Sequence, residues 1–466
     1  MNKKELIELI KPFSTSQTKL THLEQEMKSI TTNMQVAKAD EVVFYRLGPT
    51  DRDREAFYQR LTKANPGLII LSSGAEDFNN ENILYVPFEK FLEVQKILLD
   101  KLFPFKGKMK FIGITGTNGK TTTSNLAMQI STSLGHPAIS VGTIGIFDAN
   151  GEIVQDLDAT TPSYVEIRKI LHLYQDKYDA CFMEISSHAL VQNRLYDLQL
   201  DAVGWTSFSQ DHLDYHKTME EYFSAKTLIA TKFAKVANEL IVPHLEKDLI
   251  KHLSEKFPQI KLKITKPLKE RGFEKTPLFY RPDYNQSNLE LALELNELVW
   301  GNVAQVDLEK IQTPKGRFSI VEINQDAFAI VDYAHTPDAL TNIGEAIKSA
   351  FPQHSITTVF GCGGDRDRTK RPKMGEAVCA FSHKVIVTSD NPRHEKPERI
   401  IKDILPGVTK DHFVIVDREQ AIKKAVEEVS KNEIILIAGK GHEEYQDIEG
   451  VKYPFSDFDL VKKYKK

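Results

Sequence analysis

Residues 109–122 read Met-Lys-Phe-Ile-Gly-Ile-Thr-Gly-Thr-Asn-Gly-Lys-Thr-Thr, an apolar run followed by a glycine-rich turn, a lysine and two threonines. The apolar run predicts a β-strand over Met109–Thr115, and the residues after the turn predict a helix that begins near Lys120. Glycines in such a turn let backbone N–H groups approach phosphate oxygens, and the helix N-terminus adds partial positive charge. A plain glycine-rich turn is the alternative, but the Lys-Thr pair in this place favours a phosphate-binding loop.

This loop is expected to hold the phosphates of ATP. Ile114 stands where the common G-x-x-x-x-G-K pattern has its first glycine, so the loop is a shortened form of that pattern. Lys120 would contact the β- and γ-phosphates, and the Thr121 hydroxyl would ligate magnesium. The loop residues assigned to ATP are Gly116, Thr117, Asn118, Gly119, Lys120, Thr121 and Thr122.

Strand-like apolar runs alternate with helical patterns along most of the 466 residues, which is typical of α/β layers with parallel strands. Further strands are predicted at Gly67–Ser72, Ala327–Asp332, Ile356–Phe360, Lys384–Thr388 and Glu433–Ala438, whereas the rest of residues 1–107 is polar and irregular. Linker-like residues at Pro104–Gly107 and near Thr313–Gly316 indicate domain boundaries. We therefore expect an α/β protein of three domains: residues 1–107, a central P-loop-type parallel sheet in 108–314, and a Rossmann-like doubly wound sheet in 315–466.

Composition excludes several classes of protein. Lys plus Arg total 61 and Asp plus Glu total 65, so a net charge of -4 predicts no nucleic-acid partner. No apolar run approaches the ~20 residues of a membrane helix, and Glu5, Glu8 and Lys11 interrupt any signal peptide. Three widely separated cysteines fit a reducing cytosol. We expect a cytoplasmic monomer that does not insert into a membrane.

More short motifs follow the phosphate loop in a fixed order. The first are Thr160-Thr161-Pro162, Glu184-Ile-Ser186-Ser187-His188-Ala-Leu-Val-Gln192-Asn-Arg194, and Gln210–His216 followed by Lys226. The later ones are Asn285 with Asn288, Pro314–Arg317, Asp332–Asp338, Gly361–Arg368, Asp390–Arg393 and Gly439–Glu443. Together with the loop, these motifs resemble the Mur ligases, ATP-dependent amide-bond-forming enzymes, and more distantly their relatives the folylpolyglutamate synthetases. The resemblance covers about residues 108 to 450.

The resemblance implies sites for two substrates. Asn288 and Asp332 would contact adenine and ribose, while Arg317 and His335 would approach the phosphates from the C-terminal domain. Closure of the domains around ATP would then be a working step. The residues that would bind the muramoyl peptide are Thr160, Thr161, Ser186, Gln192 and Arg194.

A magnesium ion and a modified lysine are also implied. Glu184 and His212 offer a carboxylate and an imidazole that could bind Mg²⁺ beside Thr121. The resemblance implies that Lys226 carries a carbamate as a further ligand, so the expected catalytic residues are Lys120, Glu184, His212 and Lys226. The alternatives are a surface Glu184, a hydrogen-bonded structural His212 and a solvated helical Lys226 that pairs with Glu221.

The last group of motifs bears on the choice of amino acid. An arginine in a fixed loop can bind a carboxylate through two parallel hydrogen bonds. In the family, Asp-Asn-Pro-Arg at this place goes with meso-diaminopimelate, whose distal carboxylate L-lysine lacks. The implied residues are Arg366, Asp390, Asn391, Pro392, Arg393, Gly439 and Glu443. The alternative is a turn in which Arg393 pairs with Glu395 or Glu398.

The expected function is ATP-dependent addition of meso-diaminopimelate to UDP-N-acetylmuramoyl-L-alanyl-D-glutamate, through an acyl phosphate, in cytoplasmic peptidoglycan precursor synthesis. The alternatives are a lysine-adding ligase, a ligase that recycles free tripeptide or polymerises glutamate on folate, and a regulatory P-loop NTPase or scaffold paralogue. The N-terminal domain, where the UDP end would bind, departs from the family. Thr32–Gln35 replaces its Asp-Ser-Arg-like turn, and Ala159 stands where Asn is common. Uridine is then held by other side chains or less tightly, and no uridine-site residue is assigned.

Overall fold

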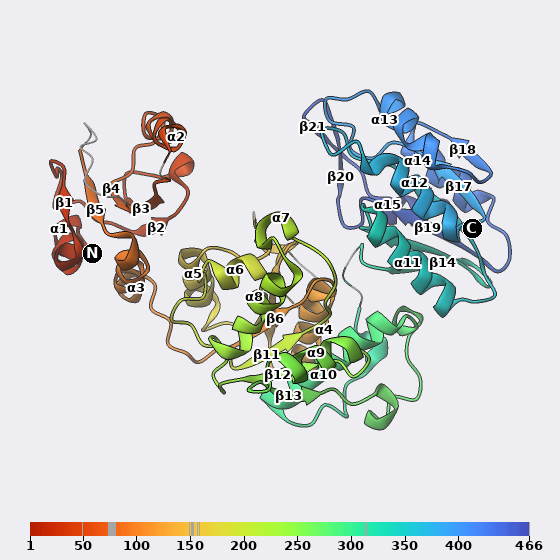
Figure 1. Cartoon of the computed structure of the whole chain (residues 1–466), viewed down its shortest axis with the longest axis horizontal. Coiled ribbons are helices and arrows are strands. Elements are labelled where there is room, and N and C mark those ends of the chain that lie inside the picture. The colour runs from red at the N-terminus through yellow and green to blue at the C-terminus, as the bar shows by residue number, and fades with distance from the viewer. Residues whose placement is uncertain are drawn as a thin grey trace.

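The computed structural model of the chain contains three α/β bodies in chain order (Figure 1). It describes residues 1–465 except residues 49, 73–80, 149, 151, 152, 156, 158, 313 and 315, and the side chains of residues 51 and 214 are also outside the description. Thr313 and Lys315, which belong to the predicted boundary at Thr313–Gly316, therefore lie outside the described residues.

The first body is built on a five-stranded sheet in the order β1-β5-β4-β3-β2. Its strands are β1 (Ser16–Gln17), β2 (Ser29–Thr31), β3 (Glu41–Arg46), β4 (Leu68–Ser72) and β5 (Ile83–Val86). Its helices are α1 (Lys3–Ile10), α2 (Asp51–Leu61) and α3 (Phe91–Leu102). All pairings are parallel except that of β1 with β5.

The prediction that residues 1–107 are largely irregular was wrong, although the predicted strand at Gly67–Ser72 matches β4. Alternate residues of β3 face opposite cores, since Val42 packs with α1 and α3 whereas Val43 packs with Phe57 of α2. A strand buried on both faces reads as a short apolar run without alternation, and β1 and β2 have only two and three residues. Such strands become recognisable only through their neighbours in the sheet.

The second body holds an eight-stranded sheet in the order β13-β12-β11-β6-β10-β7-β8-β9, parallel from β13 to β7. The strands are β6 (Lys110–Thr115), β7 (Ala138–Gly142), β8 (Gly145–Asp148), β9 (Ile153–Gln155), β10 (Ala180–Glu184), β11 (Ala202–Trp205), β12 (Glu239–Val242) and β13 (Lys261–Ile264). The helices are α4 (Lys120–Ser133), α5 (Tyr164–Tyr174), α6 (Ser187–Val191), α7 (Leu213–His216), α8 (Met219–Thr231), α9 (Lys247–Lys256) and α10 (Asp283–Trp300).

Helices cover both faces of this sheet. Ile112 of β6 packs in one core with Leu126 of α4 and Leu291 of α10, whereas Phe111 faces the other core with Ile229 of α8. The central strand β6 lies between β10 and β11, so the loop after it is flanked by the ends of two neighbouring strands. This arrangement matches the predicted mononucleotide-binding sheet.

The third body holds a six-stranded sheet in the order β14-β15-β19-β16-β17-β18, in which only β14 is antiparallel. Its strands are β14 (Ser319–Asn324), β15 (Ala327–Asp332), β16 (Ser355–Phe360), β17 (Lys384–Val387), β18 (His412–Val414) and β19 (Glu433–Ala438), and a hairpin follows of β20 (Tyr445–Ile448) and β21 (Val451–Pro454). Its helices are α11 (Pro337–Ala350), α12 (Lys370–Phe381), α13 (Pro397–Ile404), α14 (Arg418–Glu427) and α15 (Asp457–Tyr464).

The third sheet is doubly wound, as predicted. Ile434 and Leu436 of β19 pack in the same core as Ile347 of α11, whereas Ile435 packs with Ile422 of α14 on the opposite face. Strands β15 and β16 follow each other in the chain, but β19 lies between them in the sheet. The loops after β15, β16, β17 and β19 therefore open at one edge of the sheet, where ligands bind in folds of this kind.

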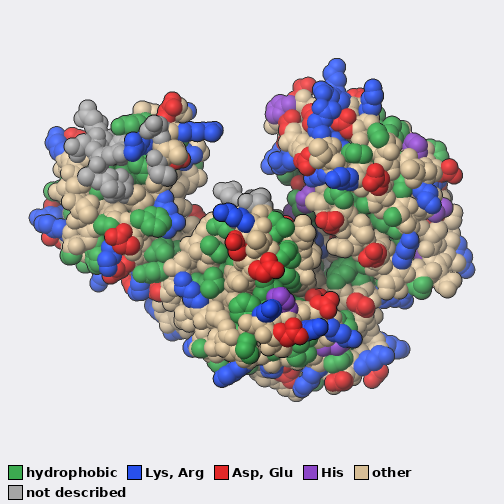
Figure 2. Space-filling view, viewed as in Figure 1, with side chains coloured by type: hydrophobic (Ala, Val, Ile, Leu, Met, Phe, Trp, Pro, Cys, Tyr) green, Lys and Arg blue, Asp and Glu red, His purple; other side chains and the backbone are tan. Residues whose placement is uncertain are grey.

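Charged side chains of both signs are interspersed over the face of the molecule in Figure 2. Among the described helices, none combines the length and the apolar character that crossing a membrane requires.

Candidate active site

The predicted phosphate loop joins β6 to α4 and has a backbone that requires glycine. Gly116 and Gly119 have φ values of 149° and 84°, in the region that side-chain-bearing residues rarely adopt. A Cβ at Gly116 would collide with the Thr206 hydroxyl, and one at Gly119 would collide with the side chain of Asn288. The loop is thus packed tightly between β11 and α10, and α4 begins at Lys120 as predicted.

The other loop residues lie around this turn. The Thr117 hydroxyl is 3.2 Å from that of Tyr222, and the Asn118 backbone N–H donates to Ser207 Oγ at 3.1 Å. Thr121 and the buried Thr122 form the first turn of α4. Asn288 of α10 accepts a hydrogen bond from the Thr123 hydroxyl at 3.1 Å, so α10 is held against the start of α4.

Two lysine side chains share one backbone carbonyl of this loop. Lys120 Nζ donates to the Gly116 oxygen at 2.9 Å, and Lys226 Nζ donates to the same oxygen at 2.8 Å. Lys226 is 1% exposed, so the alternative of a solvated helical lysine is wrong. Burial lowers the pKa of Lys226 well below its usual range, and the charge of Lys120 lowers it further, against an opposing effect of Asp211. Lys226 is therefore held in a place that favours its neutral amine.

Glu184 is buried at the end of β10, which rules out the alternative of a surface residue. Its Oε1 accepts the Thr143 N–H at 3.0 Å, and its Oε2 lies 3.3 Å from the Thr143 hydroxyl. Burial raises the pKa of this carboxyl, whereas the charge of Lys120 and a hydrogen bond from the Thr121 side chain lower it. Thr121, Glu184 and Lys120 are therefore close together, as the sequence predicted.

His212 lies at the edge of this group. It has a φ of 53° just before α7, and its ring is exposed. The ring centroid is 6.0 Å from that of Tyr222, and Lys226 Nζ lies 4.7 Å from the same tyrosine ring, so His212 and Lys226 flank Tyr222. Within the described residues, no group of three or more His, Cys, Asp or Glu side chains is arranged to hold a metal ion.

The residues predicted to bind the muramoyl peptide form one hydrogen-bonded network. The Thr161 hydroxyl accepts the Ser186 N–H at 2.9 Å and lies 3.3 Å from Ser186 Oγ. Arg194 donates to the Thr161 carbonyl and, at 2.8 and 3.0 Å, to Gln192 Oε1. Thr160 lies 3.0 Å from the Thr143 hydroxyl, which contacts Glu184. The network therefore reaches the carboxylate beside the phosphate loop.

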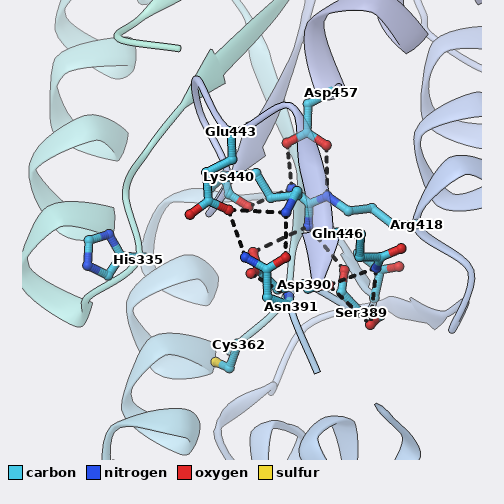
Figure 3. A network of polar contacts seen from close by, with 12 residues as sticks. His335, Cys362, Ser389, Asp390, Asn391, Arg418, Lys440, Glu443, Gln446 and Asp457 are labelled. Carbon is cyan, nitrogen blue, oxygen red and sulfur yellow. Dashed lines mark hydrogen bonds and ion pairs between the residues drawn. The ribbon is translucent and has the colours of Figure 1, made fainter. Parts of the chain in front are cut away.

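The nucleotide residues of the third body begin where β15 ends. Asp332 accepts the backbone N–H groups of Phe318 and Ala334, each at 2.8 Å. Burial raises the pKa of Asp332, and the charge of Arg317 is the largest effect that lowers it. The charge of Arg317 also lowers the pKa of Glu184, and its guanidinium carbon lies 5.0 Å from the centre of the Tyr333 ring. His335 is exposed, with Nδ1 2.8 Å from the Tyr333 carbonyl, and stands apart from the network in Figure 3.

Four of the residues predicted to bind the amino acid meet at the ends of β17 and β19 (Figure 3). Asn391 Nδ2 donates to Glu443 Oε2 at 2.7 Å, and the Asn391 N–H donates to Asp390 Oδ1 at 2.6 Å. Gly439 has a φ of 121°, and a Cβ there would lie 2.5 Å from Asp390 Oδ2. The two loops are therefore packed directly against each other.

Arg393 follows Pro392 in the loop after β17, and its side chain lies near that of Arg366. Its Nη1 donates to the Gly364 carbonyl at 2.8 Å, and its Nε is 4.0 Å from Asp447 Oδ2. A Cβ on Gly363 would lie 2.9 Å from Arg393 Nη1 and 3.7 Å from Arg366 Cγ, so both arginines flank this glycine.

The alternative pairing of Arg393 with Glu395 or Glu398 is wrong. Glu395 is bound at 2.6 Å by the fully buried Arg371. Glu398 lies in the first turn of α13 and is exposed. Among the described residues, the Arg393 guanidinium therefore contacts the Gly364 carbonyl and lies 4.0 Å from the Asp447 carboxylate.

Comparison with known proteins decides the family. Models of the Mur ligase middle domain and of the Mur ligase glutamate ligase domain match residues 114–292 and 316–441. A UDP-N-acetylmuramoyl-L-alanyl-D-glutamate–2,6-diaminopimelate ligase of Aquifex aeolicus (strain VF5) is 38% identical over 397 residues, which are 79% of this chain and 81% of that protein. The chain belongs to the Mur ligase family.

Solved structures agree with this assignment. One of a ligase with the same name as the Aquifex protein covers 100% of this Mur ligase and 98% of its own chain, with 26% identity and a TM-score of 0.62. A MurF ligase from Thermotoga maritima in complex with ADP has the same fold at 15% identity, with a TM-score of 0.56 over 89% of this chain and 94% of that chain. The predicted class, an ATP-dependent amide-bond-forming ligase, is confirmed.

Sequence reasoning missed three buried charged residues that the structure of this Mur ligase places at the loops after β17 and β19. Lys440 and Asp457 are 0% exposed, and Arg418 is 1% exposed. Arg418 binds both oxygens of Asp457, at 2.8 and 2.7 Å, and also donates to the Ala438 and Ser389 carbonyls at the ends of β19 and β17. Lys440 lies within the quoted Gly439–Glu443 motif, so its position between two glycines was an available signal. Arg418 and Asp457 begin α14 and α15 without any motif.

We expect Asp457→Ala to lower the free energy of unfolding of this Mur ligase by about 3–5 kcal/mol, because it leaves the buried Arg418 charge without its partner. Urea unfolding measures the effect. The matched control is Asp459→Ala, an exposed carboxylate two residues along the same helix, which should change stability far less. Equal decreases in the free energy of unfolding of the two variants would contradict a stabilising role for the buried Arg418–Asp457 pair.

Proposed function

We propose that this chain uses ATP to join meso-diaminopimelate to UDP-N-acetylmuramoyl-L-alanyl-D-glutamate. The observation that carries the amino-acid choice is that Asp447 joins Arg393 to the Asn391–Glu443 contact. The Asp447 N–H donates to Asn391 Oδ1 at 2.9 Å, and the Asp447 carbonyl accepts the Arg393 N–H at 3.0 Å. A guanidinium near the Glu443 carboxylate suits a group that carries a carboxylate and an ammonium together. The names of the Aquifex relative and of the solved ligase that shares its name support the same choice.

In the proposed reaction, the γ-phosphoryl group of ATP is transferred to the γ-carboxylate of D-glutamate, which forms an acyl phosphate and releases ADP. The amine of diaminopimelate then attacks the acyl carbon and loses a proton, and phosphate leaves as the amide forms. Lys120 and the loop N–H groups offset the charge that develops on the phosphoryl oxygens. The Thr161–Ser186–Arg194 network positions the peptide next to Glu184.

The remaining site assignments belong to the proposal. The ATP site comprises the phosphate loop of residues 116–122, Asn288, Arg317, Asp332 and His335, and the peptide site comprises Thr160, Thr161, Ser186, Gln192 and Arg194. The diaminopimelate site comprises Arg366, Asp390, Asn391, Pro392, Arg393, Gly439 and Glu443. Residues 1–107, 108–314 and 315–466 are the proposed domains for the UDP end, ATP and the amino acid. The enzyme is proposed to act as a monomer in the cytoplasm.

Magnesium is part of this proposal. Its ligands would be the Thr121 hydroxyl, Glu184, His212 and a carbamate on Lys226, and the ion would neutralise phosphate charge. The fit is supported by the closeness of Thr121 to the buried Glu184, whose pKa the Thr121 side chain lowers, since two such oxygens suit a hard cation. Burial lowers the pKa of Lys226, and its amine in the neutral form can attack carbon dioxide and release a proton, which replaces a second cation beside Lys120 with an anion.

We expect Lys226→Ala to reduce amide formation by roughly 10²-fold or more, the scale of losing one electrostatic partner of the reacting groups. Added formate or acetate should restore part of the activity, because a small carboxylate can occupy the space of the missing carbamate. The control is Lys232→Ala, an exposed lysine just past the end of the same helix, which should need no additive. Full activity of Lys226→Ala without any carboxylate would refute the carbamate.

Product analysis tests the proposed function as a whole. The enzyme is incubated with ATP, the UDP-linked muramoyl dipeptide and a panel of diamino acids that includes meso-diaminopimelate and L-lysine. ADP release should require both the peptide and meso-diaminopimelate, and the product mass should equal the tripeptide precursor. Equal use of L-lysine would overturn the amino-acid choice.

A further inference from the structure

Lys440 is a fully buried lysine whose partners are two side chains of the proposed amino-acid site. It follows β19, and its Nζ donates to Asn391 Oδ1 at 2.8 Å and to Glu443 Oε2 at 3.1 Å (Figure 3). Its Nζ lies 5.6 Å from the centre of the Tyr445 ring and 6.0 Å from that of Phe455. A buried charge is costly unless it is paired, so these two hydrogen bonds determine where the lysine can be.

The contacts of Asn391 allow only one orientation of its amide. Oδ1 accepts both from Lys440 Nζ and from the Asp447 N–H at 2.9 Å, whereas Nδ2 donates to Glu443 Oε2 at 2.7 Å. In the reversed orientation, the NH₂ group would face two donors and the oxygen would face a carboxylate. Lys440 therefore sets which end of Asn391 points to Glu443.

Glu443 receives both of its donors on one oxygen. Lys440 and Asn391 bind Oε2, and no residue that the structure describes donates a hydrogen bond to Oε1. Glu443 is thus presented with one oxygen committed to the protein and the other available for a ligand.

We propose that Lys440 is a positioning residue for amino-acid recognition: it fixes the orientation of Asn391 and, together with it, holds the Glu443 carboxylate so that the free oxygen Oε1 accepts the ammonium group of the incoming amino acid. The inference rests on the proposed function, because it takes these loops to be the amino-acid site. Lys440 touches no reacting atom. It acts through its two neighbours, so its removal should weaken amino-acid binding without affecting the binding of ATP.

Three variants of the full-length enzyme test this role. Lys440→Met keeps the apolar stem without the charge, and Lys440→Arg keeps the charge. The matched control is Lys452→Met, an exposed lysine whose Nζ lies 4.2 Å from the centre of the same Tyr445 ring. The KM for the amino acid, the KM for ATP and kcat are measured for each variant.

Lys440→Met should raise the KM for the amino acid by roughly tenfold or more, the effect of losing one charge-assisted hydrogen bond. The KM for ATP should stay within about twofold of the wild-type value. Lys440→Arg should keep the KM for the amino acid closer to the wild-type value than Lys440→Met does, because it retains the charge, and Lys452→Met should behave as wild type.

An unchanged KM for the amino acid in Lys440→Met, or a parallel rise in the KM values for ATP and the amino acid, would overturn the positioning role. Should Lys440→Met fail to fold, the double variant Lys440→Met/Glu443→Gln removes both charges and carries the test. Its kcat/KM for the amino acid should equal that of Glu443→Gln alone, and a further loss would overturn the proposal. If the wild-type enzyme prefers another amino acid to meso-diaminopimelate, the KM values of the Lys440 variants are measured with that amino acid. The role of Lys440 is then tested independently of the proposed substrate.

Discussion

Lys120→Ala is expected to lower kcat for amide formation by roughly 10³-fold, because it removes the cation that offsets the charge developing on the transferred phosphoryl group. The loop geometry supports this size of effect. Lys120 Nζ is held at 2.9 Å from the carbonyls of both Gly116 and Thr117, at the turn before the N-terminus of α4. Alanine would remove the charge together with these two hydrogen bonds.

ADP release and amide product are measured together for this variant. The matched control is Lys108→Ala, an exposed lysine before β6, which should retain wild-type activity. Near-normal amide formation by a folded Lys120→Ala enzyme would exclude the proposed phosphoryl transfer. ADP release that persists while amide formation stops would instead place Lys120 in the second step.

L-lysine is expected to be a poorer substrate than meso-diaminopimelate by about 10³-fold or more, since a site built for a polar group rejects the analogue that lacks it. In the lysine complex, Arg393 would lose the carboxylate that its guanidinium is oriented to bind. The free-energy cost of this loss is reduced because Asp447 lies 4.0 Å from Arg393 and because the Arg393 side chain is 24% exposed. We therefore expect a smaller preference than the largest known ones. Arg393→Ala should lower kcat/KM for diaminopimelate on the order of 10²-fold and narrow its lead over lysine.

Competition between the two amino acids measures this preference directly. The control is Arg399→Ala, an exposed arginine on the neighbouring helix α13, which should preserve the preference. If Arg393→Ala keeps the wild-type ratio of kcat/KM values, the distal carboxylate is recognised by another group, with the flanking Arg366 as the first candidate. The ligase assignment would survive that outcome.

Much of the fold could be predicted because most of the strands expected from the sequence are recognisable from their own residues. The predicted strands at Ala327–Asp332 and Glu433–Ala438 match β15 and β19 residue for residue, and those near Ile356 and Lys384 are within one residue of β16 and β17. Each is an apolar run bounded by polar residues or glycine, which buried parallel strands require. The first sheet was missed because β1 and β2 are too short to show a pattern, and only pairing with β5 and β3 makes them strands.

The candidate site likewise contains residues that the sequence pointed to and residues that it did not. The sequence identified Glu184, Lys226 and Asn391 through motifs, because their chemistry depends on residue type at a fixed spacing. It did not identify Arg418 and Asp457, since the buried pair joins residues 39 positions apart. Contacts between such distant positions are created by strand order, which no local pattern contains.

By itself, the sequence determined the phosphate loop of this Mur ligase, because a strand, two glycines of unusual backbone conformation and a helix start are all encoded within residues 109–122. Only the tertiary structure decided the state of Lys226. A lysine on a solvated helix has an ordinary pKa. The pKa of Lys226 is lowered because α8 places its side chain in a buried position, where it donates to the same Gly116 carbonyl as Lys120. The shift arises from desolvation and from a second positive charge, and both depend on where β6 and α8 pack.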